Sequence, residues 1–305
     1  MVHERIGSYR IIRLLGEGGM GLVYEAVRDD IGGRAAIKIL RAEFARNADV
    51  AGRFLNEARA VNIVQHPGVV RIFDFGKLPT GEPYLTMEFL DGGTLRDRLT
   101  REGRLNEHET MRLARQVASA VAAAHAKQII HRDLKPENVM IVQDADMPEG
   151  ERVKVLDFGI AKVIGDAAQL SAAQAKTGTG FSSFTPWYGA PEQFTRSVGA
   201  TGPWTDVFAL ALVVLEMLTQ QPPLDGEEIA QLAFSSTDPV NRPTPRQRGV
   251  SVSDAVEEVF LKAVAVKTTD RYPTAGEFWS ALRVAAGEAP MPMSRLSREI
   301  PASAF

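Results

Sequence analysis

The sequence contains no cysteine, which excludes disulfide bonds, thiolate catalysis and cysteine-ligated zinc. It also lacks an excess of either charge, because 35 Lys and Arg stand against 38 Asp and Glu, for a net charge of −3. Proteins that bind nucleic acid non-specifically are expected to be strongly basic, so this balance does not support that class. The sequence therefore predicts no nucleic-acid partner.

Long apolar segments are also missing. The longest apolar run, Val207–Leu215, stops at Glu216, far short of the roughly 20 residues that a membrane-spanning helix needs. Residues 1–8 contain no apolar run of the kind found in a signal peptide. We therefore expect a cytoplasmic protein with no membrane segment.

The composition is that of an ordinary globular protein, with 45% hydrophobic and 24% charged residues. A chain of 305 residues can bury a full core, in one large domain or two smaller ones. The pattern changes along the chain, which predicts a β-rich lobe over 1–90 and a helical lobe over 91–286. Residues 287–305 include three prolines and show no helical period, which predicts a mobile tail.

Short runs of β-branched and aliphatic residues, separated by glycines, are typical of the β-rich lobe. They predict antiparallel strands at Tyr9–Leu15, Leu22–Arg28, Ala35–Leu40, Val69–Phe75 and Pro83–Phe89. Phe54, Ala58 and Val61 recur at i, i+4 and i+7, which predicts one helix in this lobe.

The second lobe has helical periodicity instead. Helices are predicted around Leu113–Ala124 and at Val207–Gln220, Asp254–Val266 and Ala275–Ala286. The expected fold class is α+β, with a small five-stranded antiparallel lobe and one main helix, joined to a larger and mostly helical lobe. Ligands often bind at such a boundary.

A glycine loop lies between the first two predicted strands. Gly16, Gly18, Gly21 and Val23 follow the pattern G-x-G-x-x-G-x-V. In a dinucleotide-binding turn the glycines lead into a helix, whereas Leu22–Arg28 has the pattern of a strand. The glycines are therefore expected at a hairpin tip, where backbone N–H groups can approach phosphate oxygens. A plain glycine hairpin remains the alternative, and no Gly-Lys-Ser/Thr of a Walker A loop follows.

Two charges in the β-rich lobe lie within apolar patterns. Lys38 belongs to the run Ala35–Leu40, and Glu57 shares a helix face with Phe54 and Val61. Either charge alone, turned inward, would cost several kcal/mol of desolvation. Pairing the two removes most of that cost, although two solvated surface charges remain the alternative.

Three further motifs follow in order. His131–Asn138 reads His-Arg-Asp-Leu-Lys-Pro-Glu-Asn, Asp157-Phe158-Gly159 comes 24 residues after Asp133, and Ala190-Pro191-Glu192 comes later. Together with the glycine loop and Lys38, their order and spacing match the protein-kinase signature set. From residue 9 to about 286, the chain resembles the Hanks-type (eukaryotic-like) serine/threonine protein kinases, and its glycine loop resembles their bacterial branch.

The resemblance implies an enzyme that transfers the γ-phosphate of ATP to Ser and Thr hydroxyls of proteins, with Mg²⁺, or Mn²⁺ in its place. It implies that Lys38, held by Glu57, binds the α- and β-phosphates, and that Asp133 accepts the substrate proton. Lys135 would steady the γ-phosphate, and Thr185 would hydrogen-bond Asp133 and Lys135. Asn138 and Asp157 would hold the metal through oxygen ligands.

The resemblance also implies an adenine pocket and a phosphate-covering loop. Their residues would be Leu15, Gly16, Gly18, Gly19, Gly21, Val23, Ala36, Met87, Glu88, Leu90 and Met140, several of which are equally explained as core residues. Structural roles would fall to Glu192 and Arg271, as an ion pair, and to Asp206, as an anchor of the catalytic loop. Thr177 and Thr179 are candidate autophosphorylation sites, with a merely flexible polar loop as the alternative, and the family permits a homodimer.

Two other functions are compatible with the expected fold. An ATP-binding pseudokinase scaffold would usually lack one of Lys38, Asp133, Asn138 and Asp157, yet all four are present. A small-molecule phosphotransferase would not be expected to carry Ala190-Pro191-Glu192 after Thr185-Pro186. Both alternatives are therefore weaker than the protein kinase.

Overall fold

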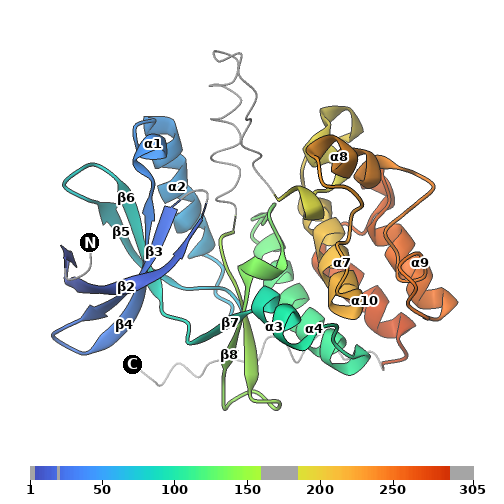
Figure 1. Cartoon of the computed structure of the whole chain (residues 1–305), viewed down its shortest axis with the longest axis horizontal. Coiled ribbons are helices and arrows are strands. Elements are labelled where there is room, and N and C mark those ends of the chain that lie inside the picture. The colour runs from blue at the N-terminus through green and yellow to red at the C-terminus, as the bar shows by residue number, and fades with distance from the viewer. Residues whose placement is uncertain (1–3, 19–20, 159–184, 289–305) are drawn as a thin grey trace.

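The computed structural model describes residues 4–18, 21–158 and 185–288, apart from a few side chains, Glu57 among them. A β-sheet with helix α2 (Ala48–Val61) forms one lobe, and the helices from α3 (Leu95–Glu102) to α10 (Ala275–Ala285) form the other (Figure 1). The chain passes between the lobes after β6 (Pro83–Glu88). The predicted bilobal α+β fold is confirmed.

The sheet of the small lobe is antiparallel and has six strands in the order β1-β2-β3-β4-β6-β5. All five predicted strands are present, as β2 (Tyr9–Glu17), β3 (Gly21–Arg28), β4 (Gly33–Leu40), β5 (Ile72–Lys77) and β6. The prediction missed β1 (Arg5–Ile6), which pairs with Tyr9 and Arg10. Two residues are too few to show an alternating pattern, so this edge strand left no signal in the sequence.

Helix α2 follows the short α1 (Ala42–Ala45) and packs against the sheet. Phe54, Ala58 and Val61, the predicted apolar face, are buried in a cluster that includes Leu40 and Leu85. The helix predicted from their spacing is therefore confirmed.

The large lobe is built around α7 (Pro203–Thr219), which is buried on every side from Thr205 to Met217. Helices α4 (Glu107–His125), α9 (Asp254–Ala263) and α10 pack against it. The prediction missed α3, α8 (Ile229–Thr237) and the four-residue α6 (Pro191–Phe194). In α3 only Leu95 and Leu99 are buried, so the helix depends on a capping box between Thr94 and Asp97 more than on an apolar stripe.

A second, three-stranded antiparallel sheet lies next to the lobe boundary. It consists of β7 (Gly92–Thr94), β8 (Val139–Gln143) and β9 (Glu151–Val155), in that order. β8 begins directly after Asn138, and β9 ends two residues before Asp157. The small sheet therefore fixes two of the predicted site residues relative to each other.

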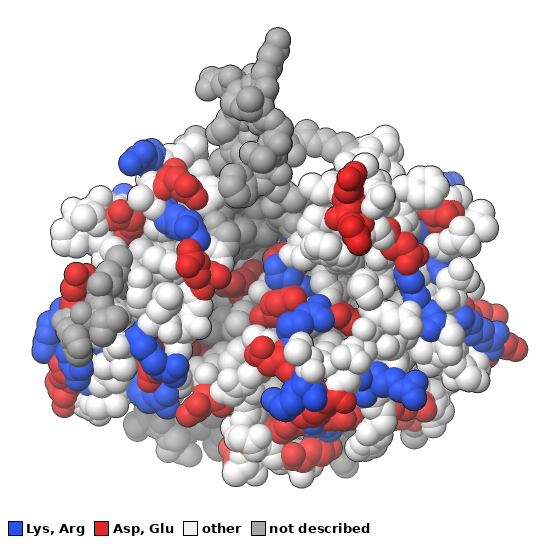
Figure 2. All heavy atoms as spheres, in the orientation of Figure 1, with Lys and Arg blue, Asp and Glu red and all other residues white. Residues whose placement is uncertain are grey.

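Positive and negative side chains are interspersed across the face shown in Figure 2. This mixture agrees with the nearly balanced net charge of the sequence. Within the described ranges, every helix is too short or too polar to cross a lipid bilayer.

Arg242 joins the C-terminal ends of two helices in the large lobe. Its side chain is buried and donates to the carbonyls of Ser236 (2.9 Å), Asp238 (2.7 Å) and Val264 (2.8 Å), just where α8 and α9 end. Carbonyls at helix C-termini carry partial negative charge, which a cation stabilises. Burial, followed by the charge of Arg271, lowers the pKa of Arg242 to about 10, so the guanidinium stays protonated at neutral pH.

We predict that Arg242→Met lowers the free energy of unfolding by about 3 kcal/mol, because several buried carbonyls lose their donor. Arg242→Lys should recover little, since one ammonium cannot reach carbonyls on both helices. Urea denaturation measures both effects. Arg101→Met is the control, because Arg101 is 66% exposed, and a loss as large as that of Arg242→Met would contradict the assignment.

Candidate active site

Asp206, in the first turn of α7, holds the segment that contains Asp133. Its carboxylate accepts hydrogen bonds from the backbone N–H of His131 (2.7 Å) and Arg132 (2.8 Å), and from His125 Nε2 (2.9 Å). Arg132 has a positive φ of 67°, an uncommon conformation for a residue other than glycine. Burial alone would raise the pKa of Asp206, but the hydrogen bonds and electrostatic interactions with His125 and His131 outweigh it, so the pKa is lowered. A buried carboxylate therefore fixes a strained loop.

His131 connects this loop to the strand end that carries Asp157. Its Nε2 donates to the carbonyl of Leu156 (2.7 Å), and its Nδ1 accepts the N–H of Asp133 (3.2 Å). The imidazole also contacts the ring of Phe158, with 4.7 Å between ring centroids. The two predicted motifs that contain Asp133 and Asp157 are thus held by one side chain.

The predicted residues Asp133, Lys135 and Thr185 meet in one cluster. Lys135 Nζ lies 2.9 Å from Asp133 Oδ2 and donates to Thr185 Oγ1 at 2.5 Å. The N–H of Thr185 donates to Asp133 Oδ1 (2.8 Å), although 52 residues separate them. Asn138 Nδ2 donates to the carbonyl of Asp133 (2.8 Å). The other side-chain atom of Asn138, Oδ1, can therefore accept a hydrogen bond or bind a metal ion.

Lys38 and Asp157 form an ion pair across the lobe boundary. Lys38 Nζ lies 2.6 Å from Asp157 Oδ1, and the Lys38 side chain is 9% exposed. Burial acts to raise the pKa of Asp157, but the charge and hydrogen bond of Lys38 outweigh it and lower that pKa. The sequence motifs gave Lys38 and Asp157 separate roles, at the phosphates and at the metal, and did not indicate that the two side chains pair directly. The Glu57 side chain, predicted to hold Lys38, lies outside the described residues.

The glycine loop joins β2 to β3 at the tip of their hairpin. The segment after the loop is therefore a strand, as predicted, and not the helix that follows the glycines of a dinucleotide-binding turn. Gly18 donates its N–H to the carbonyl of Gly21 (2.9 Å). A Cβ at Gly21 would come 2.2 Å from the carbonyl oxygen of Ile39, so only glycine fits against β4 there. Gly19 lies outside the described residues.

The residues predicted to surround adenine come from five strands and the chain between the lobes. Ala36 faces Met87 across β4 and β6, and Val23 faces Lys38 across β3 and β4. The others are Leu15 on β2, Met140 on β8, Glu88 at the end of β6, and Leu90 just beyond it. Strand pairing therefore brings Ala36, Met87, Val23 and Lys38 into adjacent positions.

Glu88 has a role that sequence reasoning missed. Its carboxylate lies 2.7 Å from Lys154 Nζ on β9 and accepts the N–H of Arg71 (2.7 Å). Its own N–H donates to the carbonyl of Arg71 (3.0 Å). The chain between the lobes is thereby attached to the strand that leads to Asp157.

Glu192 and Arg271, predicted as an ion pair, form two hydrogen bonds of 2.9 Å and are fully buried. Thr205 Oγ1 also donates to Glu192 (2.7 Å). Gln193, which the sequence analysis did not single out, donates to the carbonyl of Arg132 (2.8 Å). The segment around α6 is therefore attached both to the core and to the catalytic loop.

Arg96 forms a further connection that the sequence did not indicate. It donates to Glu137 (2.8 Å), Glu216 (2.5 Å) and the hydroxyl of Tyr188 (2.6 Å). These groups belong to the loop after Lys135, to α7 and to the segment after Thr185. No short motif in the sequence relates them, because each pair is far apart along the chain.

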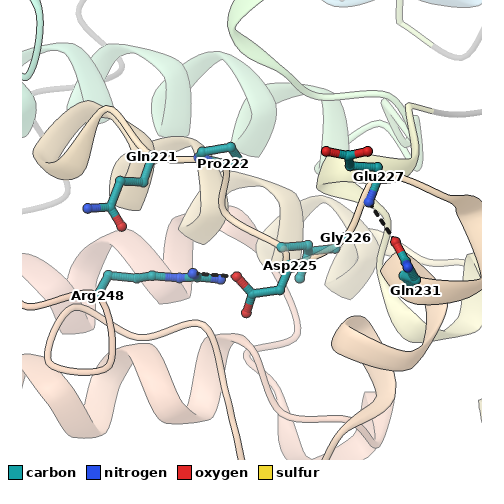
Figure 3. A pocket seen from close by; sticks show the side chains of 8 residues that line it. Gln221, Pro222, Asp225, Gly226, Glu227, Gln231 and Arg248 are labelled. Carbon is teal, nitrogen blue, oxygen red and sulfur yellow. Dashed lines mark hydrogen bonds and ion pairs between the residues drawn. The ribbon is translucent and has the colours of Figure 1, made fainter.

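A separate pocket of about 360 Å³ lies between the end of α7 and the start of α8 (Figure 3). Its Arg248 is already paired with Asp225 (2.7 Å), and Gln231 accepts the N–H of Glu227 (2.9 Å). None of the predicted site residues lines it, so the cluster around Asp133 and Asp157 remains the candidate active site. Thr177 and Thr179 lie outside the described residues.

Comparison with known proteins agrees with this geometry. A family model described as "Protein kinase domain" matches residues 9–278. Serine/threonine-protein kinase Pkn1 of Myxococcus xanthus is 40% identical over 94% of this chain and 40% of its own length. PrkC of Bacillus subtilis is 33% identical over 93% of this chain and 42% of its own length. PknA of Mycobacterium tuberculosis is 35% identical over 93% of this chain and 63% of its own length.

The chain spans less than two thirds of the length of each of these relatives. Among solved structures, a double mutant of the PknI kinase domain from Mycobacterium tuberculosis superimposes with a TM-score of 0.70. That comparison covers 94% of this chain and 99% of the other at 24% identity, so it supports the fold.

We predict that Asp206→Asn lowers the free energy of unfolding by about 3 kcal/mol or more, because an amide NH₂ then faces a backbone N–H that needs an acceptor. Amide hydrogen exchange at residues 131–133 should accelerate as well. Asp225→Asn is the control, since Asp225 is 75% exposed. Unchanged exchange in Asp206→Asn would show that the carboxylate does not hold the loop.

Proposed function

This chain belongs to the protein kinase family, and from that premise we propose that it transfers the γ-phosphate of ATP to Ser and Thr hydroxyls of proteins. The observation that carries the proposal is the cluster of Asp133, Lys135, Thr185 and Asn138 beside the Lys38–Asp157 pair. The three curated relatives above are named serine/threonine-protein kinases. This name agrees with the motif Asp-Leu-Lys-Pro-Glu-Asn, because a lysine two residues after the catalytic aspartate, here Lys135 after Asp133, indicates Ser and Thr substrates.

Asp133 is the residue that would receive the substrate. Its carboxylate accepts the hydroxyl proton as the hydroxyl oxygen bonds to the γ-phosphorus and the bond from that phosphorus to ADP breaks. The bond from the Thr185 N–H fixes the orientation of the carboxylate. Lys135, between Asp133 and Thr185, supplies positive charge to the γ-phosphate. Little covalent chemistry is required of the protein, so positioning and charge are its contribution.

Asn138 and Asp157 fit a divalent metal ion. The Asn138 amide nitrogen is used by the Asp133 carbonyl, so its oxygen is left for a ligand, and Asp157 is ionised beside Lys38. Such hard oxygen donors suit Mg²⁺, which we propose as the physiological ion with Mn²⁺ as a substitute. When bound, the ion neutralises charge on the triphosphate. Lys38 then interacts with the α- and β-phosphates.

The nucleotide would lie between the lobes. We place the phosphates under Gly16, Gly18, Gly19 and Gly21 and the adenine among Leu15, Val23, Ala36, Met87 and Met140, with the backbone of Glu88 and Leu90 at its edge. Glu57 would hold Lys38 when the nucleotide is bound. The lobe boundaries 1–90 and 91–286, the tail 287–305, a cytoplasmic location and a homodimer are further proposals.

The first test is intact-mass spectrometry of dephosphorylated protein after incubation with ATP and Mg²⁺. We expect the protein to gain phosphates on Ser or Thr, and Asp133→Asn to slow this by about 100-fold or more, the usual contribution of a general base. Asp146→Asn, an exposed carboxylate on the turn between β8 and β9, is the matched control. Binding of ATP without phosphorylation of the chain or of a generic protein substrate would favour the pseudokinase alternative.

We also propose that Thr177 or Thr179 is autophosphorylated and activates the enzyme. A phosphate adds a charge of about −1.5 to −2 and can order a segment against arginine. Arg132 offers such a partner, because its buried Nε has no hydrogen-bond acceptor among the described residues.

The double variant Thr177→Ala/Thr179→Ala should therefore lose activity several-fold toward a protein substrate. Phosphosite mapping on the unaltered chain should find phosphate at one of the two positions. Full activity of the double variant would rule out this activation.

A further inference from the structure

Arg41 connects the glycine loop to the strand that carries Lys38. It is the first residue after β4, and its Nη2 donates to Glu17 Oε1 at 2.6 Å. Nη2 and Nε also donate to the carbonyl of Gly18, at 3.2 Å and 3.3 Å. One guanidinium thus binds two consecutive residues of the loop.

The same strand holds the other arm of the loop. Gly21 pairs with Leu40 and lies so close to Ile39 that no side chain fits. Gly18 donates its N–H to Gly21, while its carbonyl accepts from Arg41. Both arms are therefore fixed to the end of β4, and Lys38 lies three residues before Arg41 on this strand.

An exposed ion pair contributes little to overall stability. Arg41 and Glu17 are 34% and 57% exposed, so a contribution to folding does not explain the contact. The contact does fix the distance between the glycine loop and Lys38. If the loop and Lys38 bind the same phosphates from two sides, affinity depends on that distance being set before the nucleotide binds. Arg41 also neutralises Glu17, whose carboxylate would otherwise repel a triphosphate.

We propose that Arg41 is a positioning residue for the nucleotide. It holds the glycine loop at the distance from Lys38 at which the loop backbone and Lys38 can bind the same phosphates. This inference rests on the proposed kinase function. It predicts that loss of Arg41 weakens binding of the triphosphate while binding of the nucleoside is unaffected, since adenosine has no phosphates for the loop to contact.

The test is calorimetric binding of ATP with Mg²⁺, and of adenosine, to the 305-residue chain and to Arg41→Ala. The Kd of ATP should rise about five- to tenfold, the loss expected for charge-assisted hydrogen bonds, while the Kd of adenosine stays constant. In steady-state phosphorylation, the KM for ATP should rise more than kcat falls. Arg41→Lys should recover only part of the loss, because an ammonium lacks the fork that binds Glu17 and Gly18 together.

Arg28→Ala is the matched control. Arg28 pairs with Asp30 on the turn between β3 and β4, with similar exposures of 41% and 57%, but at the other end of the sheet. It should leave both Kd values unchanged.

Exchanging the charges of Glu17 and Arg41 distinguishes the effect of the hydrogen bonds to Gly18 from that of the attraction between the two side chains. The swap Glu17→Arg/Arg41→Glu restores an ion pair, but Glu at position 41 cannot donate to the Gly18 carbonyl, so ATP binding should stay weak. Recovery in the swap, equal weakening of ATP and adenosine in Arg41→Ala, or no change in either Kd would each overturn the proposal. A chain that binds ATP but phosphorylates nothing would refute the kinase function and still leave this binding test valid.

Discussion

The carboxylate of Asp206 is the interaction on which the rest of the site depends. It lies inside the large lobe, where a charge is tolerated only because two backbone N–H groups and His125 donate to it. Those donors hold Arg132 in a conformation with positive φ, and that turn of the backbone sets the direction of Asp133. Glu192 and Arg271 repeat the arrangement nearby, since two fully buried charges bind each other through two hydrogen bonds. A rigid core thereby supports a loop whose own residues are polar.

Above this support, opposite charges are arranged in pairs. Lys38 lies against Asp157, and Lys135 lies between Asp133 and Thr185. Lys38 lowers the pKa of Asp157 against the effect of burial, and each lysine lies next to the position where phosphate would bind in the proposed reaction. The Lys38–Asp157 pair joins the two lobes, whereas Lys135, Asp133 and Thr185 all belong to the large lobe.

The sequence predicts those parts of the molecule that depend on local pattern. Short runs of β-branched and aliphatic residues, separated by glycines, identified the main strands. The spacing of Phe54, Ala58 and Val61 identified α2, because burial of one helix face leaves a periodic pattern. Helices α3 and α8 and strand β1 bury too few side chains to leave that trace. Within the site, ordered motifs indicated Asp133, Asn138 and Asp157, whereas Lys154, Gln193 and Arg96 act through contacts between segments that are distant in the sequence. Such contacts have no local signature, and only the folded chain brings them together.

The ion pair between Glu88 and Lys154 has a mechanical consequence. It attaches the last residue of β6 to Lys154 on β9, which precedes Leu156 by two residues and Asp157 by three. Glu88 is also hydrogen-bonded twice to the backbone of Arg71, so three segments that are far apart in the sequence are fixed to one another at this edge. Any movement of one lobe relative to the other would therefore leave the spacing between the end of β6 and β9 unchanged as long as the ion pair is intact.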